Sequence, residues 1–257
     1  MKSFAISQQK GGVGKTTNTI NIAGALAHRG HQVLAIDADP QGYLTNTLGF
    51  REAYQSDPPS LYDAIKTPHD HDAADLVVAH AEFDVLPANI DMFQLEQDLI
   101  ASGRRPRQRF GDVLDQLQDY DYVLIDAPPS LGPINDNVLL AAEDIIIPVE
   151  ADDSSVLAIE HLLNQIESLE RGYDVDIRER AILISNVNYP LDNEQADAIA
   201  WFEDTFDGRA PVFEVRNRAA IKRSLGAGGS IFGEDAEETD MTTVYDDVAA
   251  TLEEVEG

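Results

Sequence analysis

The 257-residue sequence predicts an α/β fold, a doubly wound and mostly parallel sheet with helices on both faces. Three observations predict it. Short, almost continuously apolar segments recur along the chain, as expected of strands that are buried on both faces. Amphipathic segments with helical spacing lie between most of them, which is the alternation of a parallel sheet. A glycine-rich loop joins the first apolar segment to the first amphipathic one, as in folds that begin with a strand–loop–helix unit.

The elements follow from this alternation. Strands are predicted at 4–6, 32–37, 83–87, 122–126, 144–149, 181–187 and 212–216. Helices are predicted at 16–28, 110–118, 155–171, 194–206 and 243–256. Polar residues 51–75 contain Pro58-Pro59 and read as a loop with a short helix around 61–65. Because no repeat or low-complexity linker interrupts the pattern, we expect a single domain over residues 1–257.

The glycine loop, residues 9–17, reads QKGGVGKTT. Glycines let the backbone approach an anion closely, and loop amides at a helix N-terminus attract phosphate. Lys15 is spaced to reach the β- and γ-phosphates, and the Thr16 hydroxyl is spaced to bind Mg²⁺. The expected nucleotide-binding residues are Lys10, Gly11, Gly12, Val13, Gly14, Lys15, Thr16 and Thr17. A glycine turn with two solvated lysines is the structural alternative.

Three motifs carry a family resemblance. Residues 10–17, in which Lys10 is a second lysine before Lys15, resemble the deviant Walker A loop of the ParA/MinD family of P-loop ATPases. Residues 35–42 (AIDADPQG) resemble its second motif, and residues 122–132 (YVLIDAPPSLG) resemble its Walker B strand and switch loop. The likeness is greatest to the Soj-like ParA branch, which partitions chromosomes and plasmids. It implies the P-loop NTPase fold, ATP and Mg²⁺ as ligands, and ATP hydrolysis.

The resemblance also implies roles for single residues. Asp126 is expected to hold Mg²⁺ directly or through water, and Asp39 to position the attacking water. Lys10 is expected to cross an ATP-sandwiched homodimer and contact the partner's phosphates, as an arginine finger does. The expected catalytic residues are therefore Lys10, Lys15, Asp39 and Asp126, and the expected metal ligands are Thr16, Asp126 and Asp39.

Two further positions are open to a structural alternative. Asp37, which ends the same strand as Asp39, is expected to help anchor the switch region, although carboxylates at a strand end can simply cap a turn. Asn186 is expected to contact the adenine by family likeness, and otherwise to cap a strand end.

Basic residues are few, and eight of the eighteen are gathered in two clusters. Arg216, Arg218, Lys222 and Arg223 resemble the family's DNA-contacting region, and Arg104, Arg105, Arg107 and Arg109 form the second cluster. The family likeness implies non-specific DNA binding by the ATP dimer. The alternative is that these arginines pair with local acids. Molar salt would also weaken phosphate contacts steeply.

The charge is strongly acidic, with 47 Asp and Glu against 18 Lys and Arg and a net charge of −29. Self-repulsion of this size favours a salt-accumulating halophilic source, with an archaeon the expected one, because at ~1 M salt the Debye length falls to ~3 Å. The absence of cysteine excludes disulfides, thiol catalysis and cysteine-ligated iron–sulfur sites. His69-Asp70-His71-Asp72 fits a solvated acidic loop better than a metal site.

No apolar run is long enough to span a membrane, and a strand that starts at residue 4 leaves no room for a signal peptide. We therefore expect a cytoplasmic, nucleoid-associated protein. The segment 243–256 is amphipathic with an acidic polar face, which an anionic bilayer would repel, so packing on the core is expected.

The sequence thus predicts a partition ATPase that cycles between an ATP dimer on DNA and a released form, stimulated by a ParB-like partner. The cargo could be a plasmid, a chromosome or a protein assembly. One alternative, a MinD-like membrane-associated division-site regulator, is disfavoured by the acidic C-terminal segment. The other, a nucleotide-gated scaffold with little hydrolysis, is disfavoured because Lys10, Asp39 and Asp126 are all present.

Overall fold

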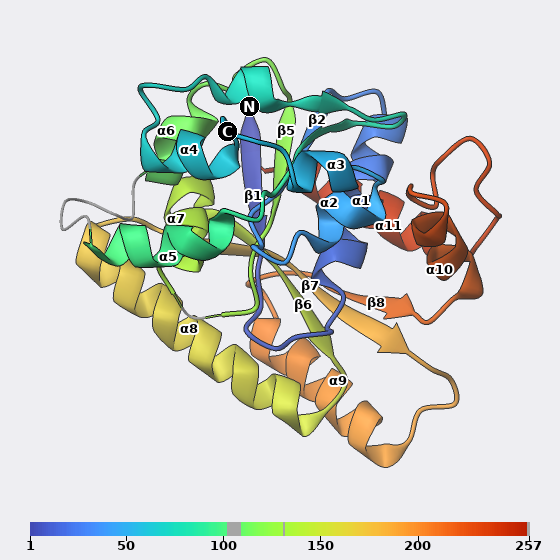
Figure 1. The fold of residues 1–257 in the computed structure, drawn as a ribbon. Coiled ribbons are helices and arrows are strands. Elements are labelled where there is room, and N and C mark those ends of the chain that lie inside the picture. The colour runs from blue at the N-terminus through green and yellow to red at the C-terminus, as the bar shows by residue number, and fades with distance from the viewer. Residues whose placement is uncertain (102–108, 131, 256–257) are drawn as a thin grey trace.

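The computed structural model describes residues 1–101, 109–130 and 132–255. Its strands form one sheet in the order β3-β4-β2-β5-β1-β6-β7-β8 (Figure 1), in which β3 is antiparallel to β4 and all other neighbours are parallel. The strands are β1 (Lys2–Ile6), β2 (Val33–Asp37), β3 (Val78–Ala79), β4 (Asp84–Leu86), β5 (Tyr122–Asp126), β6 (Asp144–Glu150), β7 (Arg178–Val187) and β8 (Val212–Arg216). The predicted fold class and all seven predicted strands are confirmed. The two-residue β3 was not predicted.

Helices connect the strands on both faces of the sheet (Figure 1). They are α1 (Lys15–His28), α2 (Tyr43–Thr47), α3 (Arg51–Tyr54), α4 (Leu61–Lys66), a 3₁₀ turn η1 (Ala73–Leu76), α5 (Met92–Ala101), α6 (Arg109–Leu114), α7 (Pro133–Ala142), α8 (Asp153–Tyr173), α9 (Asn193–Phe206), α10 (Ala219–Gly226) and α11 (Met241–Glu253). The helix predicted at 110–118 ends earlier, at Leu114, because the chain then continues in i→i+3 turns. Helices α2, α3, α5, α7 and α10 and the turn η1 were not predicted, and α3 and most of η1 lie in the stretch 51–75 that was expected to be a loop with one short helix.

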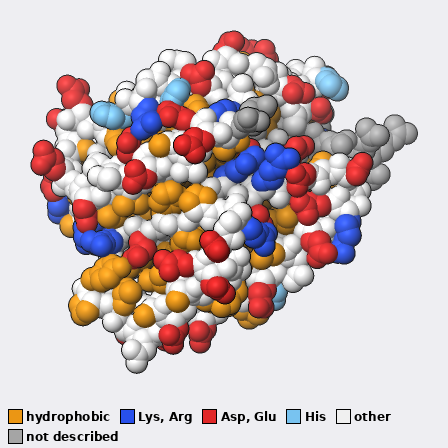
Figure 2. All heavy atoms as spheres, turned by 180° about the vertical axis from the view of Figure 1, so that it is seen from behind, with side chains coloured by type: hydrophobic (Ala, Val, Ile, Leu, Met, Phe, Trp, Pro, Cys, Tyr) orange, Lys and Arg blue, Asp and Glu red, His pale blue; other side chains and the backbone are white. Residues whose placement is uncertain are grey.

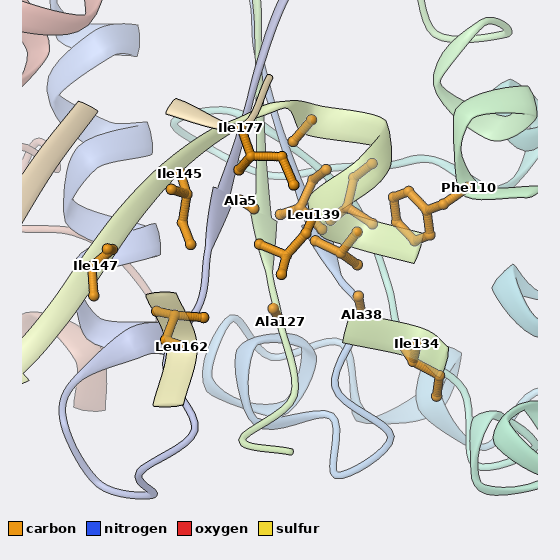
Figure 3. Close-up of a cluster of buried hydrophobic side chains, with 14 of the residues drawn as sticks. Ala5, Ala38, Phe110, Ala127, Ile134, Leu139, Ile145, Ile147, Leu162 and Ile177 are labelled. Carbon is orange, nitrogen blue, oxygen red and sulfur yellow. The ribbon is translucent and has the colours of Figure 1, made fainter. Parts of the chain in front are cut away.

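An apolar layer packs against each face of the sheet. Because successive strand residues face opposite sides, Phe4 and Ile6 of β1 belong to the layer under α1 and α11, whereas Ala5 belongs to the layer under α4 to α9. Figure 3 shows part of the second layer, where Leu139 of α7 and Leu162 of α8 approach the sheet. All of these side chains are fully or almost fully buried, so the sheet is a rigid platform for the loops at its edge.

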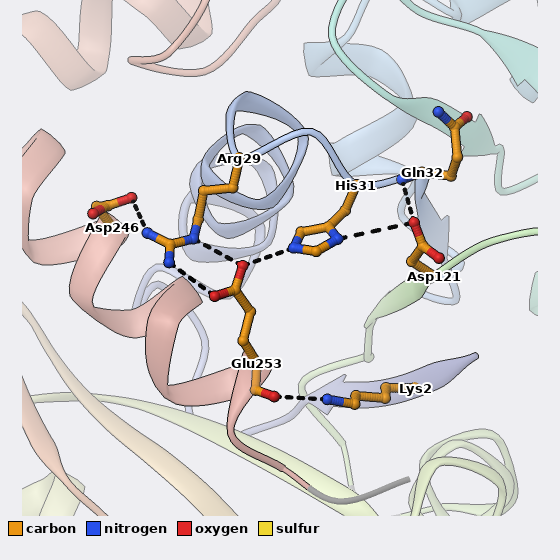
Figure 4. Close-up of polar contacts among 7 residues, drawn as sticks. All are labelled: Lys2, Arg29, His31, Gln32, Asp121, Asp246 and Glu253. Carbon is orange, nitrogen blue, oxygen red and sulfur yellow. Dashed lines mark hydrogen bonds and ion pairs between the residues drawn. The ribbon is translucent and has the colours of Figure 1, made fainter.

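The C-terminal helix α11 packs on this core, as the sequence predicted. Tyr245, Val248 and Leu252 are fully buried. Figure 4 shows that the acidic face of α11 contacts Arg29, just after α1, which donates to Glu253 at 2.8 Å and to Asp246 at 2.7 Å. Among the described residues, no helix combines the length and the apolarity that crossing a membrane would require.

Acidic side chains are spread over the surface rather than gathered in one patch. On the face in Figure 2 they are scattered over most of the surface, and the few lysine and arginine side chains lie next to them. This distribution fits a general surface property better than a single acidic docking site. The halophilic source stays a prediction.

Candidate active site

The glycine loop lies at the carboxyl end of β1, where the chain changes the direction in which it builds the sheet. Strands β2 to β5 extend one side of the sheet from β1, and β6 to β8 extend the other. In doubly wound sheets, ligands bind at such a switch point. Gly12 and Gly14 have φ of 82° and 87°, left-handed values that residues with a Cβ rarely adopt. A Cβ at Gly14 would also lie only 3.0 Å from Ser185 Oγ.

A cavity of about 840 Å³ opens over this loop. Its lining comes from the loop and the first turn of α1, from α2, from the switch segment after β5 and from the end of α10. The lining residues are Gly11, Gly12, Gly14, Lys15, Thr16, Thr17, Asp39, Tyr43, Asn46, Thr47, Pro129, Leu225 and Gly226. Most of the predicted nucleotide-binding residues thus face one cavity. Val13 is fully buried and does not line the cavity.

Thr16 and Asp126 meet at the floor of the site. Thr16 Oγ1 donates to Asp126 Oδ2 at 2.6 Å, and Asp126 is 1% exposed. A hydroxyl and a carboxylate are the oxygen ligands that Mg²⁺ prefers, and Mg²⁺ on nucleotides typically takes one or two protein ligands besides phosphate and water. The two residues therefore fit a magnesium site that is completed by a bound nucleotide.

Asp37 and Asp39 lie at and just after the end of β2 but make different contacts. Asp37 aligns with Asp126 across β2 and β5 and is fully buried. It accepts hydrogen bonds from Thr45 N at 2.8 Å and from Thr45 Oγ1 at 2.6 Å, which fixes α2 to the strand end. Asp39 instead lines the cavity and accepts a hydrogen bond from Gln41 N at 2.9 Å. Asp37 thus anchors α2, and Asp39 is the one of the two carboxylates that lines the cavity.

Burial gives the site unusual acid–base properties. Desolvation, with the nearby Asp37 carboxylate, raises the pKa of Asp126 to about 8. Desolvation also raises the pKa of Asp37 to about 7 and raises the pKa of Asp39. The pKa of Lys15 is lowered by burial, although Asp126 and Asp39 oppose the shift. A divalent cation bound among these carboxyl groups would favour their ionised forms.

These shifts make the stability of the nucleotide-free protein depend on pH. Asp126 and Asp37 bind protons more tightly when folded than in the unfolded chain, where an Asp has a pKa of ~3.9. The free energy of unfolding should therefore fall as the pH rises from about 4 through 8. Denaturant unfolding at several pH values, with EDTA and constant multimolar KCl, measures this. Asp126→Asn should flatten the dependence, and an equally steep dependence in that variant would contradict the assignment.

Lys10 is held at the rim of the site by carboxylates of its own chain. Its Nζ lies 2.5 Å from Asp152 Oδ2, 3.0 Å from Glu150 Oε2 and 3.3 Å from Ser155 Oγ. Partial burial alone would lower the pKa of Lys10, but hydrogen bonds to Asp152 and Glu150 raise it. Lys10 is not among the residues that line the 840 Å³ cavity. These partners were not identified from the sequence; they lie at the end of β6 and at the start of α8.

Asn186 lies beside the same loop. With Gly12, Gly14 and Thr17 it lines a smaller cavity of about 170 Å³. Its backbone has a left-handed φ of 59°, and its Nδ2 donates to Glu150 Oε1 at 3.0 Å. The structure thus places Asn186 next to the glycine loop. Its role as an adenine contact stays a prediction.

The late basic cluster lies at the same end of the sheet, around α10, and its arginines are paired with acids. Arg218 donates to both carboxylate oxygens of Asp240, and Arg223 pairs with Glu237. Arg216 and Arg218 also line the smaller cavity with Lys222. In the earlier cluster, Arg109 donates to the Lys66 carbonyl. Arg104, Arg105 and Arg107 lie outside the described residues.

Comparisons with known proteins show the family of the chain. A family described as an AAA domain matches residues 1–178. The sporulation initiation inhibitor protein Soj of Bacillus subtilis is 35% identical over 187 residues, 72% of each chain. The chromosome-partitioning ATPase Soj of Thermus thermophilus is 35% identical over 185 residues, 72% of this chain and 69% of its own.

Two solved structures extend the likeness to nearly the whole chain. Apo McdA from Cyanthece superimposes with a TM-score of 0.83 at 26% identity, over 98% of this chain and 99% of its own. Cobyrinic acid a,c-diamide synthase from Mycobacterium smegmatis, with bound ADP and magnesium, has a TM-score of 0.78 at 26% identity, over 98% and 94%.

Proposed function

Because the chain belongs to the ParA/MinD family of P-loop ATPases, we propose that it is a partition ATPase whose Mg-ATP state is a DNA-binding homodimer. The family likeness establishes a ParA-like ATPase that hydrolyses ATP. The observation that carries the rest is the position of Lys10. A lysine in the phosphate loop that is held outside its own cavity by carboxylates is placed to serve a second site.

The proposed ligand is Mg-ATP. The loop amides and Lys15 would hold the phosphates, and Thr16 and Asp126 would hold the magnesium ion, which neutralises phosphate charge during transfer. The relative crystallised with ADP and magnesium supports this ligand class. Asp39, on the cavity wall, would orient the attacking water and is a further candidate ligand of the ion.

In the proposed dimer, Lys10 leaves Glu150 and Asp152 and contacts the phosphates that the facing subunit binds. Its side chain is 23% exposed, and the side chains of its partners Glu150 and Asp152 are 29% and 33% exposed. Interactions between carboxylates and a lysine at such accessible positions are weak. The triphosphate bound by a facing subunit carries more negative charge than these two carboxylates, so it can replace them as the partner of Lys10. A subunit without a partner would then lack this cation at its phosphates and turn over slowly.

The proposed cargo system needs DNA and a second protein. Arg216, Arg218, Lys222 and Arg223 would contact DNA phosphates without reading the sequence. This would place the ATP state on the nucleoid. A ParB-like partner bound to a plasmid, chromosome or protein assembly would stimulate hydrolysis and release. Relatives that bear the names of partition ATPases support the proposal.

Sedimentation of Asp39→Ala protein with Mg-ATP and duplex DNA in multimolar KCl tests this function, because the substitution should trap the ATP state. We expect an ATP-dependent dimer that sediments with DNA. Arg218→Glu should weaken DNA binding by at least about tenfold. Arg171→Glu, on the exposed surface of α8, is the matched charge reversal and should not. A dimer that ignores DNA would contradict the partition mechanism.

A further inference from the structure

The candidate DNA surface around α10 is covered by an acidic segment of the same chain. Between residues 216 and 240 the sequence contains four basic residues and then five acidic ones. The acids are Glu234, Asp235, Glu237, Glu238 and Asp240, and we refer to residues 234–240 as the acidic strap. The strap lies between the end of α10 and the start of α11, in a stretch without helix or strand.

Two carboxylates of the acidic strap, Asp240 and Glu237, form ion pairs with the arginines. Asp240 receives a two-pronged contact from Arg218, with Nε at 2.7 Å from Oδ1 and NH2 at 2.6 Å from Oδ2. The same carboxylate lies 3.5 Å from NH1 of Arg216. Glu237 pairs with Arg223. This two-pronged geometry is the one that guanidinium groups also use for phosphates.

These contacts hold the arginines only loosely. The paired side chains are 37% to 58% exposed, and ion pairs at such positions contribute little to stability. The strap can therefore leave without disturbing the core. Residues on either side of the strap are fixed to the core: Ile231 N donates to Asn21 Oδ1 at 3.0 Å, and Met241, which is 2% exposed, accepts from Arg216 N at 3.1 Å.

We propose that the acidic strap is an internal competitor for DNA, which occupies Arg216, Arg218 and Arg223 with carboxylates until the phosphates of a duplex displace it. The inference rests on the proposed DNA-binding function. A duplex presents one negative charge per ~1.7 Å of its axis, so it offers phosphates to all three arginines at once. A monomeric anion cannot do this. The strap thereby restricts the surface to polyanions and offsets its positive charge in their absence.

The competition is tested with a strap variant and a matched control. The strap variant is Glu237→Gln with Asp240→Asn. The control is Glu203→Gln with Asp204→Asn, two exposed acids of α9 that give the same change in net charge. Both are placed in the Asp39→Ala background with Mg-ATP. Duplex affinity is measured by fluorescence anisotropy at several KCl concentrations. We expect roughly tenfold tighter binding for the strap variant and less than about twofold for the control.

The outcomes distinguish a failure of this inference from a failure of the proposed DNA-binding function. If strap variant and control bind DNA equally tightly, and Arg218→Glu still abolishes binding, the strap is no competitor but the DNA function stands. If neither binds DNA although both form ATP-dependent dimers, the DNA function fails and the inference fails with it. Should the double variant fold poorly, Glu237→Gln alone frees Arg223 and should still bind DNA more tightly than Glu203→Gln. Equal binding of these two single variants would also overturn the inference.

Discussion

Replacing Lys10 by alanine is expected to lower the ATP hydrolysis rate by about 10²- to 10³-fold, the usual cost of removing one group that stabilises developing transition-state charge. ATP-dependent dimerisation should be lost as well, whereas nucleotide affinity should change much less. The reason is geometric, because Lys10 is absent from the lining of its own phosphate cavity while Lys15 is part of it. Steady-state hydrolysis, analytical ultracentrifugation and nucleotide titration measure the three quantities.

Lys66→Ala is the matched control for this prediction. Lys66 is also paired with a carboxylate, at 2.8 Å from Asp98 Oδ2, but it lies on α4 away from the phosphate loop. The Lys66→Ala protein should hydrolyse ATP at the wild-type rate. Normal turnover of Lys10→Ala would refute the catalytic role of Lys10. A loss of nucleotide affinity as large as the loss of rate would instead make Lys10 a ligand of its own site.

Asp39→Ala is expected to reduce hydrolysis by at least about 10²-fold while ATP binding and the dimer persist, because a group that positions water or accepts its proton contributes mainly to the chemical step. Asp39 lines the cavity, and its neighbour Asp37 is occupied with Thr45. The ATP dimer should therefore accumulate. Single-turnover hydrolysis and sedimentation of the ATP-bound protein measure both effects.

The control for Asp39 is Asp91→Ala, an exposed acid just before α5 that does not line the cavity. It should leave rate and assembly unchanged. If Asp39→Ala hydrolysed ATP at the wild-type rate, another group would have to position the water. If it failed to bind ATP, its carboxylate would be needed for the magnesium site rather than for the water.

Much of the site was predictable because the motifs end strands. Residues that follow parallel strands meet at one edge of the sheet, so the phosphate loop after β1, Asp39 after β2 and Asp126 at the end of β5 had to converge. Apolar runs likewise marked every strand longer than two residues. Helix α7 was missed because Pro133 and the preceding prolines read as a loop, although proline is well tolerated at the first turn of a helix.

Contacts between distant segments could not be predicted. Lys10 meets Asp152 across 142 positions of sequence, and only the adjacency of β1 and β6 brings them together. The pairing of Arg218 with Asp240 depends on the path of an irregular segment that has no periodic signal. Local pairing of the arginines was weighed as an alternative from the sequence, and the structure places that pairing in the acidic strap.

The central claim, that Lys10 acts in the site of a second subunit, is tested most directly by mixing two inactive variants. In a dimer of Lys10→Ala with Asp39→Ala, one site keeps its own Asp39 and receives Lys10 from the partner. Each mixed dimer has one intact site, so activity should return, to at most about a quarter of the wild-type rate if the two variants pair at random. If Lys10 serves only its own subunit, both sites of every dimer are defective. A mixture that stays inactive although mixed dimers form would contradict the account.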